Sequence, residues 1–284
     1  NFFTTNVYPL PRVDRERWTL TLDGLVQNPL TLDWRAVEKL PAVEEMRTVE
    51  CIGNPVGGPL IGNAVWRGFP LRPLLERVRM RREAVRARFY AADGYSTSVD
   101  LKWLAQDSVL MAYAMNGEPL PVEQGYPLRI LIPGLYDQKM PRWITRIEFI
   151  DHVYAGYWER RGWSDVAAVK THAMFRSPPP RAHVSGHIYL QGIAYAGDRA
   201  ITRVEVSVDE GPWQEARLIR GESRLVWTQW YFRWHPDVPG SYTFQVRATD
   251  ERGFTQRSQP TGRPGSAFPD GADEIDRLVL IVKS

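Results

Sequence analysis

The one cysteine of this sequence, Cys51, opens the segment whose residue types most clearly suggest chemistry. Residues 49–58 read VECIGNPVGG, so an apolar approach brings a thiol to the start of a glycine-rich stretch that can approach a ligand closely. A lone thiol fits three roles: a buried core side chain, a nucleophile, or a ligand for a soft metal. An intrachain disulfide, a cysteine-rich zinc site and an iron–sulfur cluster held by this chain alone are excluded, because each needs more cysteines.

The positions of the histidines narrow these roles. A cysteine nucleophile is usually activated by a histidine base. The chain has five histidines, and all lie far along the sequence from Cys51, at residue 152 or later: His152, His172, His183, His187 and His235. Residues 150–180 are expected to be a connector and the residues after it a β domain, so all five histidines fall in one of these two regions. The sequence therefore disfavours Cys–His hydrolysis, and it contains no paired Cys/His spacing for zinc. A single thiolate suffices as a metal ligand only where a cofactor supplies the other ligands.

The first half of the chain shows a mixture of strand and helix signals. The elements that they predict must position the segment around Cys51. Residues 18–24 alternate between apolar and polar side chains and end in Asp-Gly, which predicts a hairpin-like start. Asp33 can cap a short helix, and Pro70 and Pro73 open a second one. Residues 51–68 have no period and are rich in glycine, proline and asparagine, which predicts a long, shaped loop.

Turn and strand signals recur between these helices and the middle of the chain. Residues 93–98, DGYSTS, predict a turn followed by a strand. Residues 115–121, MNGEPLP, have the composition of a turn. Residues 129–134, RILIPG, predict a short buried strand that Pro-Gly ends.

A connector and a β domain are expected in the second half. Residues 150–180 carry glycines, large aromatics and a stiff proline run, which is typical of a connector. Alternation with a period of two then predicts strands over residues 204–208, 242–248 and 278–282. Short alternating strands separated by turns favour an antiparallel β-sandwich of immunoglobulin type. We therefore expect an α+β chain with two domains, residues 1–174 and 175–284.

Composition excludes several classes of protein. The 284 residues are 43% hydrophobic, and the net charge is only +3, which makes nucleic acid a poor candidate partner. No run of residues approaches the roughly 18 apolar residues that a membrane helix needs. The sequence starts without a basic and apolar leader, so we expect that any export signal has been removed or never existed.

An ordered set of motifs resembles the sulfite oxidase family of molybdopterin-dependent oxidoreductases. CIGN at residues 51–54 resembles the family's Cys-x-Gly-Asn motif, whose cysteine ligates molybdenum. The other similar segments follow in the family's order: residues 3–11 (FTTNVYPLP), 93–98, 115–121, 125–129 (GYPLR), 133–143, 201–209 (ITRVEVSVD) and 230–234. One such motif alone is weak, but the ordered set covers nearly the whole chain.

The resemblance implies a fold, a cofactor and a reaction. The fold is a mixed α/β molybdenum-cofactor domain of the sulfite oxidase type, followed by an all-β, immunoglobulin-like dimerisation domain. The cofactor is molybdenum held by molybdopterin, a pterin dithiolene, and the reaction is a two-electron oxygen-atom transfer to or from a small substrate. Cys51 would be the protein's ligand to the metal, and Tyr95 would lie beside the transferable oxygen as a second catalytic residue. The alternative for Tyr95 is a half-buried strand residue.

Further residues would contact the pterin and its phosphate. Arg129 and Arg142 match the family's basic phosphate contacts, with Lys139 close by. Asn6 matches an asparagine beside the cofactor, and Asp93 could accept hydrogen bonds from pterin N–H groups. The alternatives are a surface position for the arginines and a turn role for Asp93.

Departures from the family's pattern concern the substrate. Sulfite oxidases bind their dianionic substrate with arginines and a tryptophan. Here Thr5 and Val7 replace the arginine and the histidine of the entry motif, Pro55 stands after the Cys-x-Gly-Asn motif, Gln124 replaces a histidine, and the loop after Cys51 is short. Because charge complementarity holds a small dianion, we expect that sulfite is not the preferred substrate.

The resemblance also implies partners and a location. The chain has no haem domain and no Cys-x-x-Cys-His motif, so we expect a separate electron carrier, either a cytochrome or a membrane redox protein. A homodimer is expected through sandwich aromatics, and the alternative is that they form the sandwich core: Trp227, Trp230, Tyr231 and Trp234. The start directly before the first motif suggests that a leader or anchor preceded it, and hence a periplasmic or extracytoplasmic location.

Two rival functions fit parts of the sequence. A non-enzymatic ligand-binding protein, with a β-sandwich that recognises sugar or peptide, would account for the 12% aromatic content but not for the motifs around Cys51. A family member that has lost its metal and serves as a scaffold is disfavoured, because Cys51, Tyr95 and Arg129 are all present.

Overall fold

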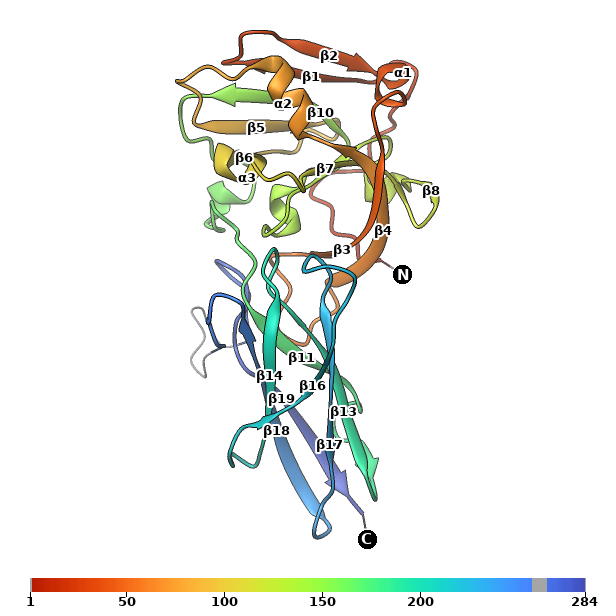
Figure 1. Cartoon of the computed structure of the whole chain (residues 1–284), viewed down its shortest axis with the longest axis vertical. Coiled ribbons are helices and arrows are strands. Elements are labelled where there is room, and N and C mark those ends of the chain that lie inside the picture. The colour runs from red at the N-terminus through yellow and green to blue at the C-terminus, as the bar shows by residue number, and fades with distance from the viewer. Residues whose placement is uncertain (1, 257–264, 284) are drawn as a thin grey trace. The chain divides into compact units, whose positions relative to one another are not determined.

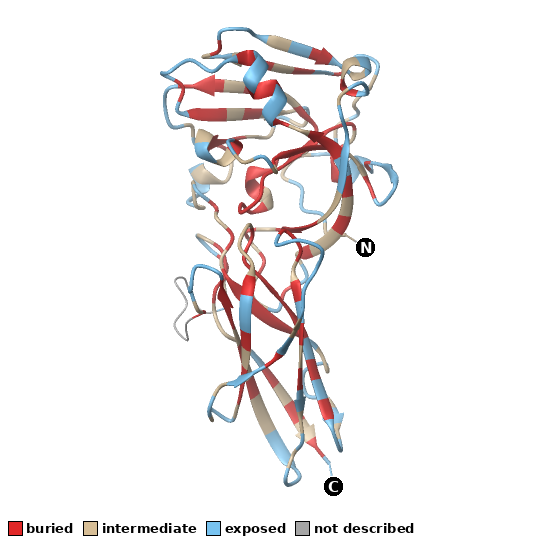
Figure 2. Cartoon of the chain, in the orientation of Figure 1, coloured by how far each residue is buried: buried red, intermediate tan, exposed pale blue. Residues whose placement is uncertain are grey.

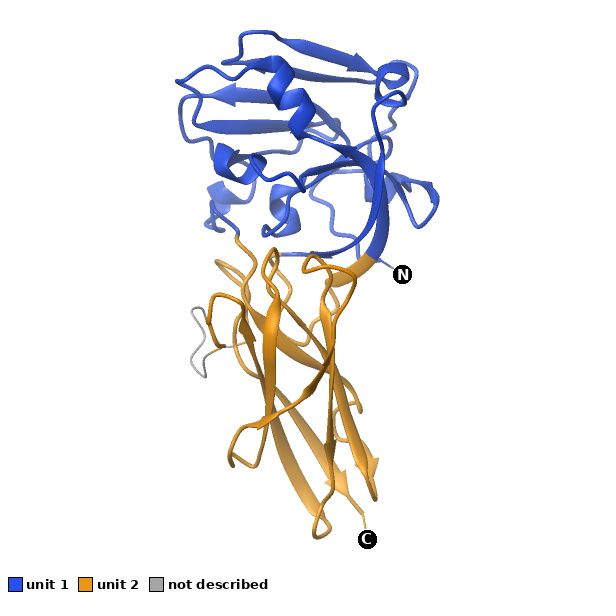
Figure 3. Cartoon of the chain, in the orientation of Figure 1, with its two compact units in different colours: residues 1–51, 64–167 blue, residues 52–63, 168–284 orange. Residues whose placement is uncertain are grey.

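The computed structural model describes residues 2–256 and 265–283 in two compact units (Figure 1). The first unit comprises residues 1–51 and 64–167, and the second comprises residues 52–63 and 168–284 (Figure 3). The expected mixed α/β domain followed by an all-β sandwich is confirmed. The domain change was expected at 174/175, and strand β11 (His172–Ser177) lies across that position. Within the described residues, no helix has both the length and the apolar character needed to cross a membrane.

Two sheets and short helices build the first unit. One sheet has the order β2-β1-β10-β5-β6 and the other the order β3-β4-β7-β8, with β9 paired to β7. The strands are β1 (Thr19–Gly24), β2 (Leu30–Asp33), β3 (Val43–Glu50), β4 (Ile61–Pro70), β5 (Arg86–Ala91), β6 (Ser96–Asp100), β7 (Leu110–Met115), β8 (Glu118–Pro119), β9 (Arg129–Leu131) and β10 (Ile144–Ile150). The helices are α1 (Trp34–Val37), α2 (Arg72–Val78) and α3 (Leu101–Leu104), with 3₁₀ turns η1 (Val122–Gln124), η2 (Asp137–Lys139) and η3 (Glu159–Arg161).

Local signals account for several of these elements. The carboxylate of Asp33 accepts a hydrogen bond from the backbone N–H of Ala36 at 2.8 Å, which caps α1 as expected. Asn116 and Gly117 both have positive φ, 53° and 84°, and join β7 to β8. That pair of conformations is the tight hairpin turn that Asn-Gly favours, so the expected turn is confirmed.

The expectation of a loop over residues 51–68 is wrong for its second part, which forms β4. Ile61, Ala64 and Trp66 of this strand are buried, and β4 pairs with β7. A Cβ atom on Gly68 would lie 2.0 Å from the backbone oxygen of Met111. Gly68 therefore allows a close approach of two strands at an irregularity in their register, and a glycine that suggested a loop serves the sheet.

Two facing sheets form the second unit. One has the order β11-β13-β17-β16 and the other the order β12-β19-β18-β14-β15. The strands besides β11 are β12 (His183–Val184), β13 (Ile188–Tyr195), β14 (Ile201–Val208), β15 (Gln214–Glu215), β16 (Arg217–Ile219), β17 (Thr228–Trp234), β18 (Gly240–Asp250) and β19 (Asp276–Val282). Buried and exposed positions alternate along them (Figure 2), as the period of two predicts.

Trp230, in β17, does not belong to the dimerisation face that the sequence suggested. Trp230 is 1% exposed and packs edge-to-face against Phe175, with ring centroids 5.4 Å apart. Trp234 packs against Tyr242 in the same core cluster. A Cβ atom on Gly192 would lie 2.5 Å from the Trp230 ring, so that glycine leaves room for the indole. Trp230 therefore fills the sandwich core, which is the alternative considered for it, and its assignment to a dimer interface is wrong. Trp234 and Tyr231 are partly buried, and their place in a dimer interface stays a prediction.

Candidate active site

Cys51 lies immediately after β3, where this strand has become buried. The burial of β3 increases along its length, and Val49 and Glu50 are almost inaccessible to water. The indole of Trp66 in β4 donates a hydrogen bond to the backbone oxygen of Arg47 at 3.4 Å, which ties this end of β3 to the neighbouring strand. The thiol itself is half-buried. A strand end with a partly accessible thiol suits a ligand role better than a core role.

The loop after Cys51 has a fixed shape within the second unit. The buried side chain of Asn54 accepts a hydrogen bond from the backbone N–H of Leu60 at 2.9 Å. A Cβ atom on Gly58 would lie 2.4 Å from the side-chain oxygen of Asn54, so the turn admits only glycine there. The guanidinium of Arg176 donates to the backbone oxygens of Gly57 and Gly58 at 3.4 and 3.2 Å. The glycine-rich segment is therefore braced by side chains of its own unit.

Arg129 is a buried cation in β9 of the first unit. Its guanidinium donates to the carboxylate of Asp137 at 2.6 Å and to the side-chain oxygen of Gln124 at 3.1 Å, and it lies 5.1 Å from the Trp66 ring centroid. Burial lowers the pKa of Arg129 to about 10, and the charge of Asp137 opposes that shift. Its Nε–H is buried and has no hydrogen-bond partner among the described residues.

Arg142 ties the N-terminal segment to this region. Its guanidinium donates to the backbone oxygen of Glu123 at 2.6 Å and to the backbone oxygen of Thr5, and it stacks 4.8 Å from the Trp143 ring centroid. Asn6 follows Thr5 directly and is exposed. The structure thus brings the segment that carries Asn6 to Arg142.

Gln124 stands where the family pattern has a histidine, and its side chain forms hydrogen bonds that the sequence did not suggest. Its amide donates to the backbone oxygen of Phe3 at 3.0 Å and to the hydroxyl of Thr4 at 3.1 Å, while its oxygen accepts from Arg129. Gln124 therefore connects the N-terminal segment to the buried arginine. The side chain of Gln124 is a neutral amide, so Gln124 adds no positive charge to the region.

Asp93 and Tyr95 form the turn that leads into β6. The carboxylate of Asp93 accepts a hydrogen bond from the backbone N–H of Tyr95 at 2.9 Å, which is the turn role considered for it. Burial raises the pKa of Asp93, and the positive charge of Arg142 opposes the shift, so these two side chains sense one another. The cofactor role of Asp93 stays a prediction.

The phenol of Tyr95 is held as a neutral donor. Its hydroxyl donates to the backbone oxygen of Gln138 at 2.7 Å. Burial raises the pKa of Tyr95 well above 10, and the negative charges of Glu159 and Asp137 raise it further. The phenol therefore keeps its proton at any physiological pH.

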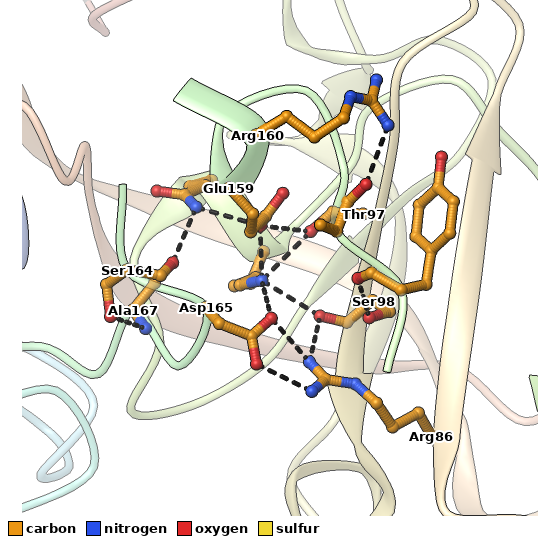
Figure 4. A network of polar contacts seen from close by, with 12 residues as sticks. Arg86, Thr97, Ser98, Glu159, Arg160, Ser164, Asp165 and Ala167 are labelled. Atoms are coloured by element: carbon orange, nitrogen blue, oxygen red, sulfur yellow. Dashed lines mark hydrogen bonds and ion pairs between the residues drawn. The ribbon is translucent and has the colours of Figure 1, made fainter. Parts of the chain in front are cut away.

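Lys139, in η2, takes part in a buried network of polar side chains. The sequence had suggested instead that it lies beside the arginines that contact the phosphate. Its ammonium donates to the hydroxyl of Thr97 at 3.2 Å, to the backbone oxygen of Ser98 at 3.1 Å, and to the carboxylate of Glu159 (Figure 4). An ammonium has three N–H donors, so protein oxygens take all of them. Burial lowers the pKa of Lys139, and the charge of Glu159 opposes this shift.

The residues expected in the site therefore form two groups within the first unit. In one group, Arg129 bonds Asp137 of η2, and the charge of Arg142 acts on Arg129 and on Asp93. In the other group, Tyr95 donates to the backbone of Gln138 in η2, and the neighbouring Lys139 bonds Thr97 and Ser98. Trp66 connects Arg129 to β3, the strand that precedes Cys51. Their roles toward a cofactor stay predictions.

The donor set fits a metal complexed by an organic carrier better than a bare metal ion. Among the described residues, no group of three or more His, Cys, Asp or Glu side chains could hold a metal ion. A soft thiol at the end of β3, an unpaired buried N–H on Arg129 and a second guanidinium on Arg142 fit a thiolate-ligated metal whose organic carrier bears a phosphate.

Sequence reasoning missed the residues that hold the turn around Gln138. Residues 150–180 were expected to be a connector, yet Glu159 and Asp165 of that stretch are the partners of Lys139 and Arg86. Nothing in the periodicity identifies them. The signal that could have found them is a buried lysine in η2, because a buried ammonium needs a carboxylate partner.

Comparison with known proteins gives a consistent result. A family model described as the oxidoreductase molybdopterin binding domain matches residues 7–158, and one described as the Mo-co oxidoreductase dimerisation domain matches residues 166–262. The oxidoreductase YuiH of Bacillus subtilis is 33% identical over 150 residues, which cover 53% of this chain and 74% of that protein.

Two further similarities extend over more of the chain. Rat mitochondrial sulfite oxidase is 28% identical over 277 residues, covering 82% of this chain and 50% of that protein, so this chain spans about half of its length. The crystal structure of the sulfane dehydrogenase SoxCD from Paracoccus pantotrophus superposes with a TM-score of 0.78 at 23% identity, over 95% of this chain and 79% of that one. This last similarity shows the fold.

Proposed function

This chain belongs to the family of oxidoreductases with a molybdopterin-binding domain, and we propose that it transfers an oxygen atom to or from a small substrate in a two-electron reaction. The cofactor of this family is molybdenum held by molybdopterin, and the related proteins are oxidoreductases. The observation that carries the proposal is Cys51, a soft ligand at the end of a buried strand in the unit that also buries Arg129. Family membership removes the support for a non-enzymatic binding protein.

The roles of the binding residues follow from their chemistry. Cys51 would hold the metal as a thiolate, because a bound metal deprotonates a coordinating thiol. Arg129 and Arg142 would bind the phosphate of the pterin carrier with guanidinium donors, and Asn6 and Asp93 would hydrogen-bond its polar edges. Lys139 would act indirectly, because its N–H donors all point to protein oxygens.

The chain's own chemical contribution to the reaction is a proton held in place. When bound, the cofactor supplies a two-electron redox centre that accepts or gives one oxygen atom. Tyr95 has one O–H, which the backbone oxygen of Gln138 accepts at 2.7 Å, so the phenol would release that acceptor in order to donate to the oxygen being transferred. Its raised pKa keeps this proton on the phenol. The direction of the transfer is not fixed by this arrangement, because the scaffold serves either direction.

We propose that sulfite is not the preferred substrate. Thr5 and Val7 stand where the sulfite oxidase pattern has an arginine and a histidine, and Pro55 occupies the position of another arginine. Gln124, in place of a histidine, uses its amide on Phe3 and Thr4. Hydrogen bonds to charged groups contribute about 1.5–3 kcal/mol each, so the loss of two arginines would weaken dianion binding by several kcal/mol.

The proposal includes an electron carrier, a dimer and a location. The match to the dimerisation domain supports a homodimer formed through the second unit. The other two parts of the proposal rest on resemblance to the family. They are an exchange of electrons with a cytochrome or a membrane redox protein, and a location outside the cytoplasm. Light scattering that gives only a 32.6 kDa species at micromolar concentration would contradict the dimer.

Metal analysis tests the proposal directly. Protein produced in a host that makes the cofactor should contain about one molybdenum per chain. Cys51→Ser should reduce that content to about a tenth or less, with loss of the thiolate-to-metal absorption. Tyr95→Phe is the matched control, because it should keep the metal while activity falls by about 10²-fold. Wild-type protein without molybdenum, or Cys51→Ser with full content, would overturn the proposal.

A substrate screen then identifies the reaction. Sulfite, sulfoxides, N-oxides and nitrate should be compared with an artificial electron donor or acceptor. We expect turnover of at least one uncharged or singly charged compound, and a KM for sulfite far above micromolar. Efficient sulfite oxidation with micromolar KM would contradict the proposal on substrate.

A further inference from the structure

Glu159 is a buried carboxylate to which the proposed function gives no role. Its side chain is 3% exposed and lies in η3. One of its oxygens accepts from the hydroxyl of Thr97 at 2.8 Å, from the side-chain amide of Gln138 at 3.0 Å, and from the ammonium of Lys139. The other oxygen is buried and has no hydrogen-bond partner among the described residues. So costly an arrangement calls for a reason beyond packing.

A second ion pair extends the network around Lys139. The guanidinium of Arg86 donates to both carboxylate oxygens of Asp165 at 2.7 and 2.9 Å, and to the backbone oxygen of Ser98 at 3.2 Å. Ser98 also accepts from Lys139 (Figure 4). The backbone of β6 is therefore gripped by two cations next to the turn that carries Tyr95.

Gln138 connects this network to Tyr95. Its backbone oxygen accepts the hydrogen bond of the Tyr95 hydroxyl, while its side-chain amide donates to Glu159 and, at 3.0 Å, to the backbone oxygen of Ser164. The next residue, Lys139, binds Thr97 and Ser98 of the strand that follows Tyr95. The phenol and its acceptor are thus fixed relative to one another from both sides.

We propose that the buried pair of Lys139 and Glu159 is the positioning device for the Tyr95 phenol, acting through the backbone oxygen of Gln138. This inference rests on the proposed function, in which Tyr95 meets the transferable oxygen. Glu159 and Lys139 are positioning residues in this scheme, because they reach the site only through Gln138 and β6. Removal of the Glu159 charge releases Lys139 from its carboxylate and loosens the turn that accepts from Tyr95.

The electrostatic surroundings give this proposal a direct readout. Three carboxylates face the phenol: Glu159 from η3, Asp137 from η2, and Asp93 from the turn before β6, and each raises the pKa of Tyr95. Neutralising Glu159 while keeping its shape therefore lowers the pKa of Tyr95. The direction is the same whether or not the cofactor takes part in the measurement.

Titration of the phenol in the full-length holoenzyme is the first test. The absorbance difference between each protein and its Tyr95→Phe counterpart, from about pH 8 to about pH 11.5, isolates Tyr95. Glu159→Gln should lower the pKa of Tyr95, so that Tyr95 ionises at a lower pH than in the wild type. Glu148→Gln is the matched control, because Glu148 accepts from a different phenol, Tyr90, in the same unit. It should leave the Tyr95 titration unchanged.

Kinetics provide the second test. Glu159→Gln should lower kcat by about 10- to 100-fold with little change in KM, because a misplaced phenol affects the reacting oxygen rather than binding. In the Tyr95→Phe background, the same substitution should change kcat by less than about twofold. Glu159→Asp keeps the charge and should restore the pKa of Tyr95 and most of kcat.

The outcomes separate this inference from the proposed function. A molybdenum-loaded wild type that turns over no candidate substrate would defeat the proposed function, while the titration would still decide whether Glu159 acts on Tyr95. An unchanged Tyr95 titration in Glu159→Gln, or two substitutions whose effects on kcat multiply independently, would overturn the inference. If Glu159→Gln does not fold, the double variant Lys139→Met with Glu159→Leu replaces it: a lowered Tyr95 pKa and a reduced kcat would support the inference, and unchanged values of both would overturn it.

Discussion

Two carboxylates that folding removes from water, Glu159 in the first unit and Asp250 in the second, are treated in opposite ways. Asp250 is 2% exposed, and both of its oxygens are satisfied. One accepts from the backbone N–H groups of Arg252 and Phe254, and the other from the hydroxyl of Thr171 and the guanidinium of Arg199. These donors lower the pKa of Asp250 against the effect of burial.

Glu159 has three donors on one oxygen and none on the other. Its partner Lys139 has a lowered pKa, because burial outweighs the attraction of the carboxylate. A fully satisfied carboxylate such as Asp250 stabilises the sandwich, whereas a half-satisfied one is retained at a cost. The difference is the one we expect if the first unit gives up stability to hold Tyr95, whereas Asp250 serves only the stability of the second unit.

The largest expected effect on stability comes from Lys139→Met, which breaks the buried ion pair of the first unit. It leaves Glu159 buried with no cation beside its bonded oxygen, and breaking a buried pair in this way costs about 3–5 kcal/mol. The midpoint of urea unfolding, followed by a signal from the first unit, should fall accordingly. The double variant Lys139→Met with Glu159→Leu is the control, and it should recover at least about half of the loss because no unpaired charge remains. A single variant as stable as wild type would show that Glu159 is not held as a charge.

A smaller effect is expected from Asp250→Asn, which keeps the shape of the side chain. Loss of charge-assisted bonds to Arg199 and Thr171 should cost about 2 kcal/mol at neutral pH. The folded pKa of Asp250 is below its unfolded value, so this stabilisation is present above the unfolded pKa near 3.8 and is lost as the pH falls through the folded pKa.

Urea unfolding of the two proteins at pH 7 and in acid checks this dependence. The difference between wild type and Asp250→Asn should shrink as the pH falls below about 4. Arg220→Gln, which changes an exposed arginine of the same unit, should show no such trend. A difference that persists in acid would mean that Asp250 stabilises the sandwich as an uncharged group.

The same contrast explains which parts of the molecule the sequence could predict. The sandwich strands follow from a period of two, since Val204, Val206 and Leu280 fill one core by alternation. The cap at Asp33 and the Asn116-Gly117 turn follow from local hydrogen bonding and backbone preference. The order of motifs singled out the segments around Cys51, Tyr95 and Arg129, whose roles toward a cofactor stay predictions.

Long-range pairing is what local patterns could not reveal. Lys139 meets Glu159 across 20 residues and Thr97 across 42, and neither pair leaves a trace in periodicity. Gly68 looked like a loop residue because only its strand partner, β7, explains it. Trp230 looked like an interface residue because its pocket depends on Gly192, which lies on another strand. In each case a tertiary contact determined the role of the residue.

The smallest expected effect concerns Asp93, whose carboxylate differs from both of the others by being only half-buried. Burial raises its folded pKa above the unfolded value, so its favourable contribution is complete below pH 3.8 and is lost as the pH rises through the folded pKa. Asp93→Asn keeps an oxygen for the N–H of Tyr95 and should therefore change stability at pH 7 by at most about 0.5 kcal/mol, in the stabilising direction.

Molybdenum content separates the two roles of this residue. If Asp93 only forms the turn, Asp93→Asn leaves the molybdenum content unchanged, whereas if its carboxylate accepts hydrogen bonds from the pterin, the substitution lowers that content. Lower stability at pH 7 together with full metal content would contradict both the sign of the shift and the cofactor role.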